Sequence, residues 1–259
     1  MAIRVGTCGY QFFDPGEGWQ DTYESTLQAY SDAYQVGELN RTFYSLPMVK
    51  TAERWRREAV EGFEFTVKAW QAMTHSWGSP TWNDNRDEIP DEWTDDVGYL
   101  QPTEAVRHGW EETRKRAEAL AASIVVLQTP PGFDATEAHA ADMRELLGTI
   151  DRGDLELAWE PRGTWHDNHD WVGELCDDLD LIHVVDIFRD EPVSDHEIAY
   201  VRLHGRNEDR YDYDYDYDEA EIDELAGRLR ALDSDHADVY CLFNNYEMHS
   251  NATALLDRL

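Results

Sequence analysis

The chain of 259 residues is 41% hydrophobic and contains 10 tryptophans, enough apolar material for one large α/β barrel or two small domains. Its 55 acidic residues outnumber 22 lysines and arginines, and the formal net charge of −33 creates a field that repels phosphate groups. We therefore expect no nucleic-acid partner. Because the sequence has no run of about eighteen apolar residues, we also expect no membrane-spanning helix and no membrane partner.

Eight short apolar segments predict β-strands, and helical patterns separate most of them. The strands are expected at residues 3–7, 36–40, 63–69, 124–128, 155–159, 181–186, 199–204 and 238–243. The helices are expected at residues 22–34, 51–60 (with Thr51 as the N-cap), 102–122, 136–150, 171–179, 218–232 and 247–259. This alternation predicts a single (β/α)8 TIM-type barrel over residues 1–259, with a doubly wound open sheet as the alternative. Residues 187–198 show no helical pattern, so the helix there is expected to be reduced.

Two irregular segments depart from this regular pattern. Residues 76–102 form a long polar insertion that carries tryptophans, and an insertion of this kind in a compact domain is expected to serve function. Residues 211–218 read YDYDYDYD. We interpret them as a solvated acidic loop, with cation binding or closure over a ligand as alternatives. The alternation resembles a strand, but a charge at every second position makes a poor one.

The acidic surface and the cysteines indicate the compartment. Acidic excess occurs in disordered chains, but the periodic apolar segments of this chain argue against disorder. We interpret the charge as halophilic adaptation to a concentrated-salt cytoplasm, where screening removes self-repulsion. The N-terminus shows no pattern of a secretory signal. Cys8, Cys176 and Cys241 are widely spaced and fit neither a disulfide framework nor a zinc motif. We therefore predict a cytoplasmic protein.

Polar residues gather where the predicted strands end, which is where TIM barrels place their active sites. Those residues are Thr7, Cys8, Tyr10, Glu38, Asn40, Thr42, Tyr44, Lys68, His75, Gln128, Glu160, Arg162, Asp186, Arg202, His204, Asn244 and Asn245. Three pairs are two residues apart and so share a face of their strand: Glu38 with Asn40, Glu160 with Arg162, and Arg202 with His204. We predict a shared polar cluster at the barrel mouth. The alternative is a structural ion-pair network that caps the core.

Lys68 is one of only three lysines, with Lys50 and Lys115. At a strand end it can bind an anion, form a Schiff base, or transfer a proton if its pKa is lowered. With Arg162, Arg202 and His204 it would form a basic pocket. This pattern predicts a small anionic or polyhydroxylated ligand, such as a phosphorylated sugar or a carboxylate.

The predicted catalytic groups are Glu160, Lys68 and Glu38, with either glutamate as the acid or base. The predicted ligand-binding residues are Asn40, Arg162, Asp186, Arg202, His204, Asn244 and Tyr10. Alternatively, Glu38, Glu160, Asp186 and His204 offer the donor types of an Mg²⁺ or Mn²⁺ site, although neighbouring cations oppose a divalent ion. We therefore assign no metal ligands and no cofactor.

Other chemistries find less support in the sequence. No glycine-rich phosphate loop, GxGxxG or GxSxG motif is present. Cys8 has no nearby partner that would make it a nucleophile, and His183, in mid-strand, is interpreted as a core residue.

Seven motifs in order along the chain together resemble the YecE-like family, a family of unknown function. They are VGTCGY at 5–10, GELNRTFYSLP at 37–47, FEFTVKAWQAMTH at 63–75, VVLQTPPGF at 125–133, LAWEPRGTW at 157–165, YVRLHG at 200–205 and FNN at 243–245. The resemblance implies a TIM barrel and no particular activity. It also implies a polar pocket from Glu38, Asn40, Lys68, Glu160, Arg162, Asp186, Arg202, His204 and Asn244. Cys8 stands where serine is more usual, which weakens a nucleophilic role there, and the insertion at 76–102 is a further departure.

Three functions are compatible with these residues. The first is an enzyme that acts on a small anionic or sugar-like ligand at the mouth of the barrel. The second is a non-catalytic module that binds or senses such a ligand. The third is a divalent-metal-dependent enzyme resembling a sugar isomerase or hydrolase. The number of titratable groups favours catalysis.

Overall fold

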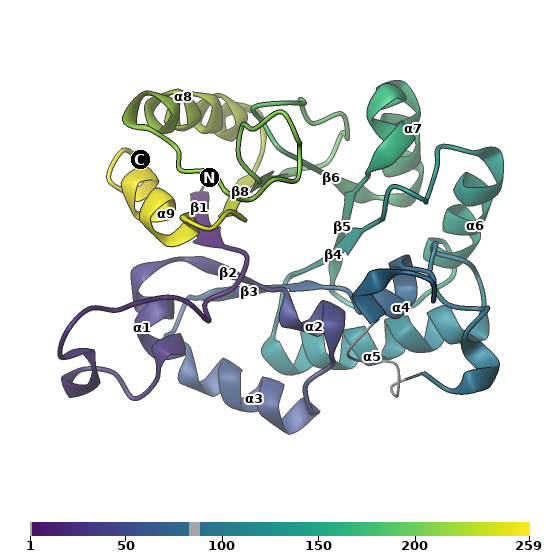
Figure 1. The fold of residues 1–259 in the computed structure, drawn as a ribbon, viewed down its shortest axis with the longest axis horizontal. Coiled ribbons are helices and arrows are strands. Elements are labelled where there is room, and N and C mark those ends of the chain that lie inside the picture. Colours follow the sequence, from purple (N-terminus) through teal and green to yellow (C-terminus); the bar gives the residue numbers. More distant parts are fainter. Residues whose placement is uncertain (1, 83–88) are drawn as a thin grey trace.

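The computed structural model describes residues 2–82 and 89–259. Eight parallel strands close into a barrel in chain order, with the last strand paired to the first. This closure confirms the TIM-type fold and excludes the open sheet (Figure 1). The strands are β1 (Ala2–Thr7), β2 (Val36–Leu39), β3 (Glu64–Lys68), β4 (Ile124–Gln128), β5 (Glu156–Glu160), β6 (Leu181–Val185), β7 (Ile198–Leu203) and β8 (Asp238–Phe243).

Helices surround this ring of strands on the outside (Figure 1). The longer ones are α1 (Thr26–Ala33), α3 (Val49–Glu58), α5 (Glu104–Leu120), α6 (Glu137–Leu147), α7 (His169–Leu179), α8 (Glu219–Asp235) and α9 (Met248–Leu256). Short helical segments are α2 (Arg41–Tyr44), α4 (Gln71–Thr74), η1 (Trp19–Asp21), η2 (Pro80–Trp82), η4 (Asp91–Trp93) and η5 (Gly163–Asp167). The chain from β6 to β7 forms no helix, as predicted. Within the described residues, no helix has the length and apolar character needed to cross a membrane.

Helix starts follow side-chain caps where the sequence supplies them. Thr103 and Thr136 each accept a hydrogen bond from a backbone N–H three residues later, at the starts of α5 and α6. The prediction that Thr51 caps α3 is wrong. The helix begins at Val49, and the Thr51 N–H donates within the first turn to the carbonyl oxygen of Met48, 2.8 Å away.

The strand alternation divides the buried side chains into two layers. On β5, Leu157 and Trp159 belong to the large cluster between barrel and helices, whereas Ala158 belongs to a smaller cluster within the barrel. The inner cluster is apolar, with Val126 of β4 beside it. Because side chains two apart share a face, the next inward residue of β5 is Glu160. The barrel interior therefore changes from apolar to charged toward the carboxyl ends of the strands.

The described part of the insertion after β3 builds a small core of its own. Trp82 is fully buried, and its ring contacts those of Trp70 and Trp77 at centroid distances of 6.2 and 5.2 Å. Its Nε1 donates to the carbonyl oxygen of Ser76, 3.1 Å away. The tryptophan at position 82 therefore contributes to packing, and residues 83–88 of the insertion lie outside the described part of the chain.

Candidate functional site

A buried ion-pair network joins three strands at the carboxyl end of the barrel. Arg202 of β7 is fully buried, and its Nη2 donates to Glu38 Oε1 of β2 at 2.8 Å. Its Nη1 donates to Glu160 Oε2 of β5. From the next turn of chain, Arg162 donates Nε and Nη2 to Glu160 Oε1 at 3.0 and 2.9 Å. Two guanidinium groups thus hold two carboxylates.

The network fixes the charge of Glu160. Burial by itself raises the pKa of this carboxyl, but the charges of Arg202 and Arg162 outweigh burial and hold the pKa well below its usual range. Glu38 is held differently, because its Oε2 accepts a hydrogen bond from the Tyr200 hydroxyl at 3.0 Å. All four carboxylate oxygens of the two glutamates therefore already have donors. Tyr200, in mid-strand, was not among the predicted residues.

A cavity of about 720 Å³ opens at the mouth of the barrel. Its charged lining residues are Lys68 and Arg162, and no Asp or Glu is among the lining residues in the described part of the chain. Burial and the charges of Lys68 and Arg162 lower the pKa of His75, which also lines the cavity, to about 3, so this imidazole is neutral near pH 7. Amides and aromatic rings form most of the remaining wall: Asn40, Gln128, Asn244, Asn245, Phe12, Phe43, Tyr44, Tyr213 and Tyr246.

Lys68 is the last residue of β3 and is 8% exposed. Its Nζ lies over the ring of Phe43, 3.9 Å from the centroid. Within residues 2–82 and 89–259, no carboxylate oxygen lies within 4.0 Å of this nitrogen. Burial, with the positive charges of Arg202 and Arg162, lowers the pKa of Lys68 to about 7. At neutral pH the amine is therefore present in both its charged and its neutral form.

The segment at residues 211–218 folds its tyrosines onto the site. The guanidinium of Arg162 lies over the ring of Tyr211, 3.8 Å from its centroid, and the Tyr211 hydroxyl is hydrogen-bonded to His166 Nε2 at 3.0 Å. Tyr213 lines the mouth cavity, and its ring centroid lies 5.8 Å from that of His204. The acidic loop therefore contributes aromatic contacts to the basic residues of the site.

In residues 211–218 the tyrosines and the aspartates alternate, and the two residue types differ in exposure. The aspartates at positions 212, 214, 216 and 218 are exposed, whereas Tyr217 is buried and its hydroxyl accepts the Gly205 N–H at 2.8 Å. Gly205 has φ of 103°, and a Cβ there would lie 2.5 Å from Cβ of Tyr215. Glycine at the end of β7 thus permits the close approach of the loop. The interpretation as a solvated acidic loop describes the aspartates and not the tyrosines.

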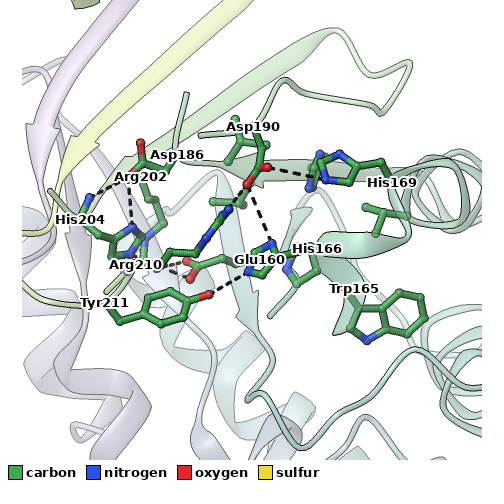
Figure 2. Close-up of a pocket in the computed structure, with 15 residues that line it drawn as sticks. Glu160, Trp165, His166, His169, Asp186, Asp190, Arg202, His204, Arg210 and Tyr211 are labelled. Carbon is green, nitrogen blue, oxygen red and sulfur yellow. Dashed lines mark hydrogen bonds and ion pairs between the residues drawn. The ribbon is translucent and has the colours of Figure 1, made fainter. Parts of the chain in front are cut away.

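A second, smaller space of about 30 Å³ lies beside Glu160 (Figure 2), large enough for about one water molecule. There Asp190 accepts a hydrogen bond from Arg210 and lies 3.6 Å from His169 Nε2 and 3.9 Å from His166 Nδ1. Among the described residues, no three or more His, Cys, Asp or Glu side chains are grouped so that they could hold a metal ion.

Comparison with known proteins identifies the family. The family described as "Protein of unknown function DUF72" matches residues 4–259. The chain belongs to the DUF72 family. YecE-like is another name for this family, so the resemblance is confirmed. The protein is 26% identical over 272 residues to UPF0759 protein YunF of Bacillus subtilis, covering 94% of this chain and 88% of YunF.

Solved structures are similar to this DUF72 protein in fold. A DUF72 family protein from Thermotoga maritima has a TM-score of 0.72 at 22% identity, covering 100% of this chain and 99% of that one. A DUF72 family protein from Enterococcus faecalis has a TM-score of 0.72 at 17% identity, covering 99% and 94%. A xylose isomerase domain containing protein from Salmonella typhimurium has a TM-score of 0.53 at 13% identity, covering 93% of each chain.

The structure of this DUF72 protein separates the predicted site residues by depth. Those that line the mouth cavity are Asn40, Lys68, Arg162 and Asn244. Those that lie in the buried network or around the smaller space beside Glu160 are Glu38, Glu160, Asp186, Arg202 and His204. The predicted cluster is therefore present, and it combines a solvent-accessible cavity with the ion-pair network that the sequence left as an alternative.

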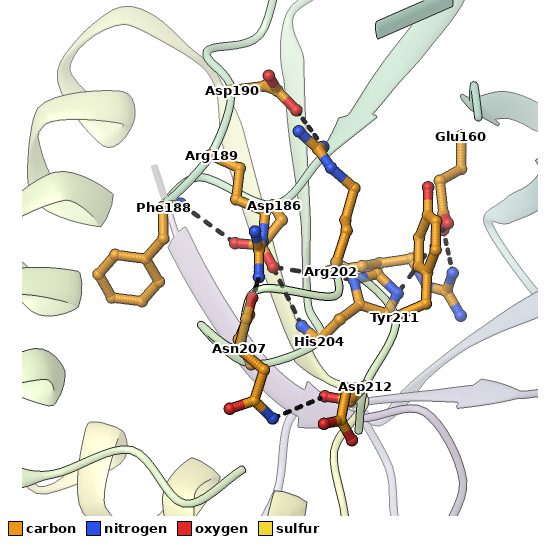
Figure 3. Close-up of polar contacts among 12 residues, drawn as sticks. Glu160, Asp186, Phe188, Arg189, Asp190, Arg202, His204, Asn207, Tyr211 and Asp212 are labelled. Atoms are coloured by element: carbon orange, nitrogen blue, oxygen red, sulfur yellow. Dashed lines mark hydrogen bonds and ion pairs between the residues drawn. The ribbon is translucent and has the colours of Figure 1, made fainter. Parts of the chain in front are cut away.

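Asp186 and His204 are joined at the ends of β6 and β7. The Asp186 carboxylate accepts the backbone N–H groups of Phe188 at 3.2 Å and of His204 at 3.1 Å (Figure 3). Burial lowers the pKa of His204, more than the neighbouring carboxylates raise it. In these positions Asp186 stabilises the turns that follow the two strands, and it does not line the mouth cavity.

Tyr10 and Cys8 of the first loop both line a side cavity next to the mouth cavity. Tyr10 lines a side cavity of about 350 Å³ that shares Asn40 and Tyr44 with the mouth cavity. Cys8 lines both cavities, and burial raises the pKa of its thiol, which leaves no thiolate for nucleophilic chemistry near neutral pH. His183, predicted as a core residue, is buried and its Nδ1 accepts the Val193 N–H at 3.3 Å.

The sequence prediction missed several aromatic residues of the mouth. Phe12, Tyr213 and Tyr246 line the cavity but were not among the predicted residues. Each follows a strand end within a loop, and only the tyrosine repeat gave a signal that could have been used. From the described part of the insertion at 76–102, Thr81 reaches the cavity.

Proposed function

We propose that this DUF72 protein is an enzyme that acts on a small anionic ligand in the mouth cavity. One observation carries the proposal. Lys68 and Arg162 line the cavity, and the described lining includes no carboxylate, although the chain contains 55 acidic residues. Both cations are buried, at 8% and 9% exposure, so solvent and salt screen them less than surface charges. Such a pair favours a carboxylate or phosphate group.

The amides of the cavity support a ligand that also carries hydroxyl groups. Asn40 Oδ1 and Asn245 Oδ1 are buried, and neither has a hydrogen-bond partner among the described residues. Their nitrogens are engaged: Asn40 Nδ2 donates to the Cys8 carbonyl at 3.0 Å, and Asn245 Nδ2 donates to the Tyr215 carbonyl at 2.7 Å. Buried acceptors of this kind are normally satisfied by protein, water or ligand, and in this cavity a water molecule or a ligand hydroxyl would supply the missing donor.

Lys68 is the group we assign to proton transfer. Its amine exists in both protonation states near pH 7, as an acid or base in catalysis requires. Glu160 and Glu38 are less suited to this role, because guanidinium groups already occupy their oxygens and neither lines the cavity. We assign to the glutamates the positioning of the cations Arg162 and Arg202.

Removing either cation is expected to weaken anion binding. The probes are glycolate and inorganic phosphate, titrated by calorimetry in a fixed concentration of KCl. Lys68→Met and Arg162→Met should each lose a charge-assisted contact worth about 1.5–3 kcal/mol, which lowers the affinity roughly 10–150-fold. Lys50→Met is the control, since Lys50 is exposed and does not line the cavity. Binding of both probes that is equal in all four proteins would contradict the proposal.

A non-catalytic binding module is the second candidate, favoured by the occupied carboxylates. It needs only the charge of Lys68, whereas the enzyme needs an amine that loses its proton near neutral pH. Acylation by acetic anhydride distinguishes them, because only the neutral amine reacts. With the pKa of Lys68 lowered to about 7, its relative reactivity should rise through that pH and then level.

The two other lysines provide the reference within the same chain. Lys50 and Lys115 are exposed, so they serve as the reference amines for the labelling. Peptide mass spectrometry after competitive labelling gives the three midpoints. A midpoint for Lys68 that equals those of Lys50 and Lys115 would make it a permanent cation and favour the binding module.

A further inference from the structure

Large exposed hydrophobic side chains gather at the mouth cavity. In the described part of the chain the large exposed hydrophobic side chains are Phe12 (83% exposed), Tyr44 (47%), Met48 (73%), Tyr246 (74%) and Leu259 (42%), and three of these five lie at the mouth. Phe12, Tyr44 and Tyr246 line the mouth cavity. A single exposed ring needs no explanation, but several around one cavity are typical of a ligand site.

The wall of the cavity therefore changes from charged at its base to aromatic at its opening. Lys68 and Arg162 are almost completely buried, whereas Phe12 and Tyr246 are largely exposed. We call the two cations the floor and the rings of Phe12, Tyr44 and Tyr246 the rim. The volume of about 720 Å³ lies within the range of sites for drug-sized ligands, which bury mostly apolar surface. A hydroxylated anion alone would contact the floor and leave the rim in water.

We infer that the ligand of this cavity is a small anion that carries a planar apolar group, aryl or heteroaryl. The anionic group contacts Lys68 and Arg162, and the planar group packs against the rim. This inference rests on the proposed function, because it assigns the second end of the same ligand. Aromatic rings attract planar groups through stacked and edge contacts in addition to area burial, and an apolar group is not repelled by the acidic surface.

Matched pairs of anions test the inference. Phenyl phosphate is compared with methyl phosphate, and phenylacetate with acetate, by calorimetry in a fixed concentration of KCl. We expect the aryl member of at least one pair to bind about tenfold more tightly to the wild-type protein, as burial of a ring predicts. The pair that shows the larger difference identifies the anionic group as phosphate or carboxylate.

Variants locate the effect on the rim. Phe12→Ala combined with Tyr246→Ala should reduce the ratio of the aryl to the alkyl affinity to about twofold or less. Met48→Ala is the matched control, because Met48 is 73% exposed and does not line the cavity; the ratio should stay at its wild-type value. Lys68→Met should weaken both members of a pair together. Thermal melts establish that the rim variants are folded, and each single replacement provides a milder test.

The outcomes separate this inference from the proposed function. Equal affinities within both pairs, with binding that still depends on Lys68, would overturn the planar group and leave the anion site intact. An aryl preference that survives replacement of both Phe12 and Tyr246 would overturn the rim as its cause. Binding independent of Lys68 and Arg162 would overturn the proposed function itself.

Discussion

Replacing Arg202 by methionine is expected to lower the free energy of unfolding by about 3–5 kcal/mol. Arg202 and Glu38 are fully buried, and Glu160 is 5% exposed. Methionine retains much of the length of the side chain, but among the described residues it leaves the Glu38 carboxylate with only the Tyr200 hydroxyl as a hydrogen-bond donor. Glu160 would retain Arg162. The dominant loss is therefore the charge that compensates Glu38.

Urea denaturation at constant KCl measures this loss. Arg144→Met is the matched control, because Arg144 pairs with Glu174 and Asp178 on partly exposed side chains, and surface pairs contribute about 0–1 kcal/mol. Adding Glu38→Gln to Arg202→Met should recover part of the stability, since it removes the uncompensated charge. A loss no larger than that of the control would show that the network does not stabilise the fold.

The stability loss of Arg202→Met should depend on pH in a direction that the pKa of Glu160 determines. In the wild-type protein the pKa of Glu160 is below its usual range, so Glu160 contributes stability that is present above its unfolded pKa and is lost as the pH falls through the folded pKa. Removing Arg202 raises the folded pKa and weakens this contribution at neutral pH. The difference from wild type should therefore be nearly constant between about pH 7 and about pH 5, and it should become smaller as the pH falls below about 4, the ordinary pKa range of a glutamate.

Salt should stabilise this protein strongly. The net charge of −33 repels itself, and the Debye length falls from about 30 Å at about 0.01 M KCl to about 3 Å at about 1 M. We expect a Tm on the order of 10 °C higher at the higher concentration, equivalent to about 3 kcal/mol for a chain of this size. Differential scanning calorimetry at the two concentrations measures the shift.

A charge-reduced variant separates screening from other effects of salt. Replacing the exposed residues Glu53, Glu61 and Glu145 by lysine changes three charges by +2 each, so the net charge goes from −33 to −27. This variant should melt at a higher temperature than wild type in dilute buffer and at a similar temperature in concentrated KCl. Equal melting of wild type in both salt concentrations would remove halophilic adaptation as the explanation of the charge.

The strands and their polar ends could be predicted from the sequence, because both signals are local. In residues 155–160 an apolar run ends in Glu160, and the structure ends β5 at that glutamate. The period of two along a strand also placed Glu160 and Arg162 on one side, where they are hydrogen-bonded to each other. Strand ends moved by one residue and helix ends by up to four, because capping and pairing with neighbours decide where a strand or helix stops.

Partners across the barrel could not be predicted from local pattern. Glu38 and Arg202 are separated by 164 positions, and only the closure of β8 onto β1 brings β7 within reach of β2. The stagger of the strands then sets how deep each side chain lies. Sequence position alone made Glu38 and Lys68 equivalent candidates, whereas the structure buries one in the network and opens the other to the cavity.

By itself, the sequence therefore determined the number of strands, their order along the chain and the chemical types of the groups at their ends. The tertiary structure decided which of those groups meet. The aromatic rim shows the difference, because Phe12 and Tyr246 come from loops after β1 and β8 and Tyr44 comes from the short helix α2, and the three share one cavity only after the barrel closes. Local preferences fix strands and their faces, but distances between loops depend on the closure and stagger of all eight strands.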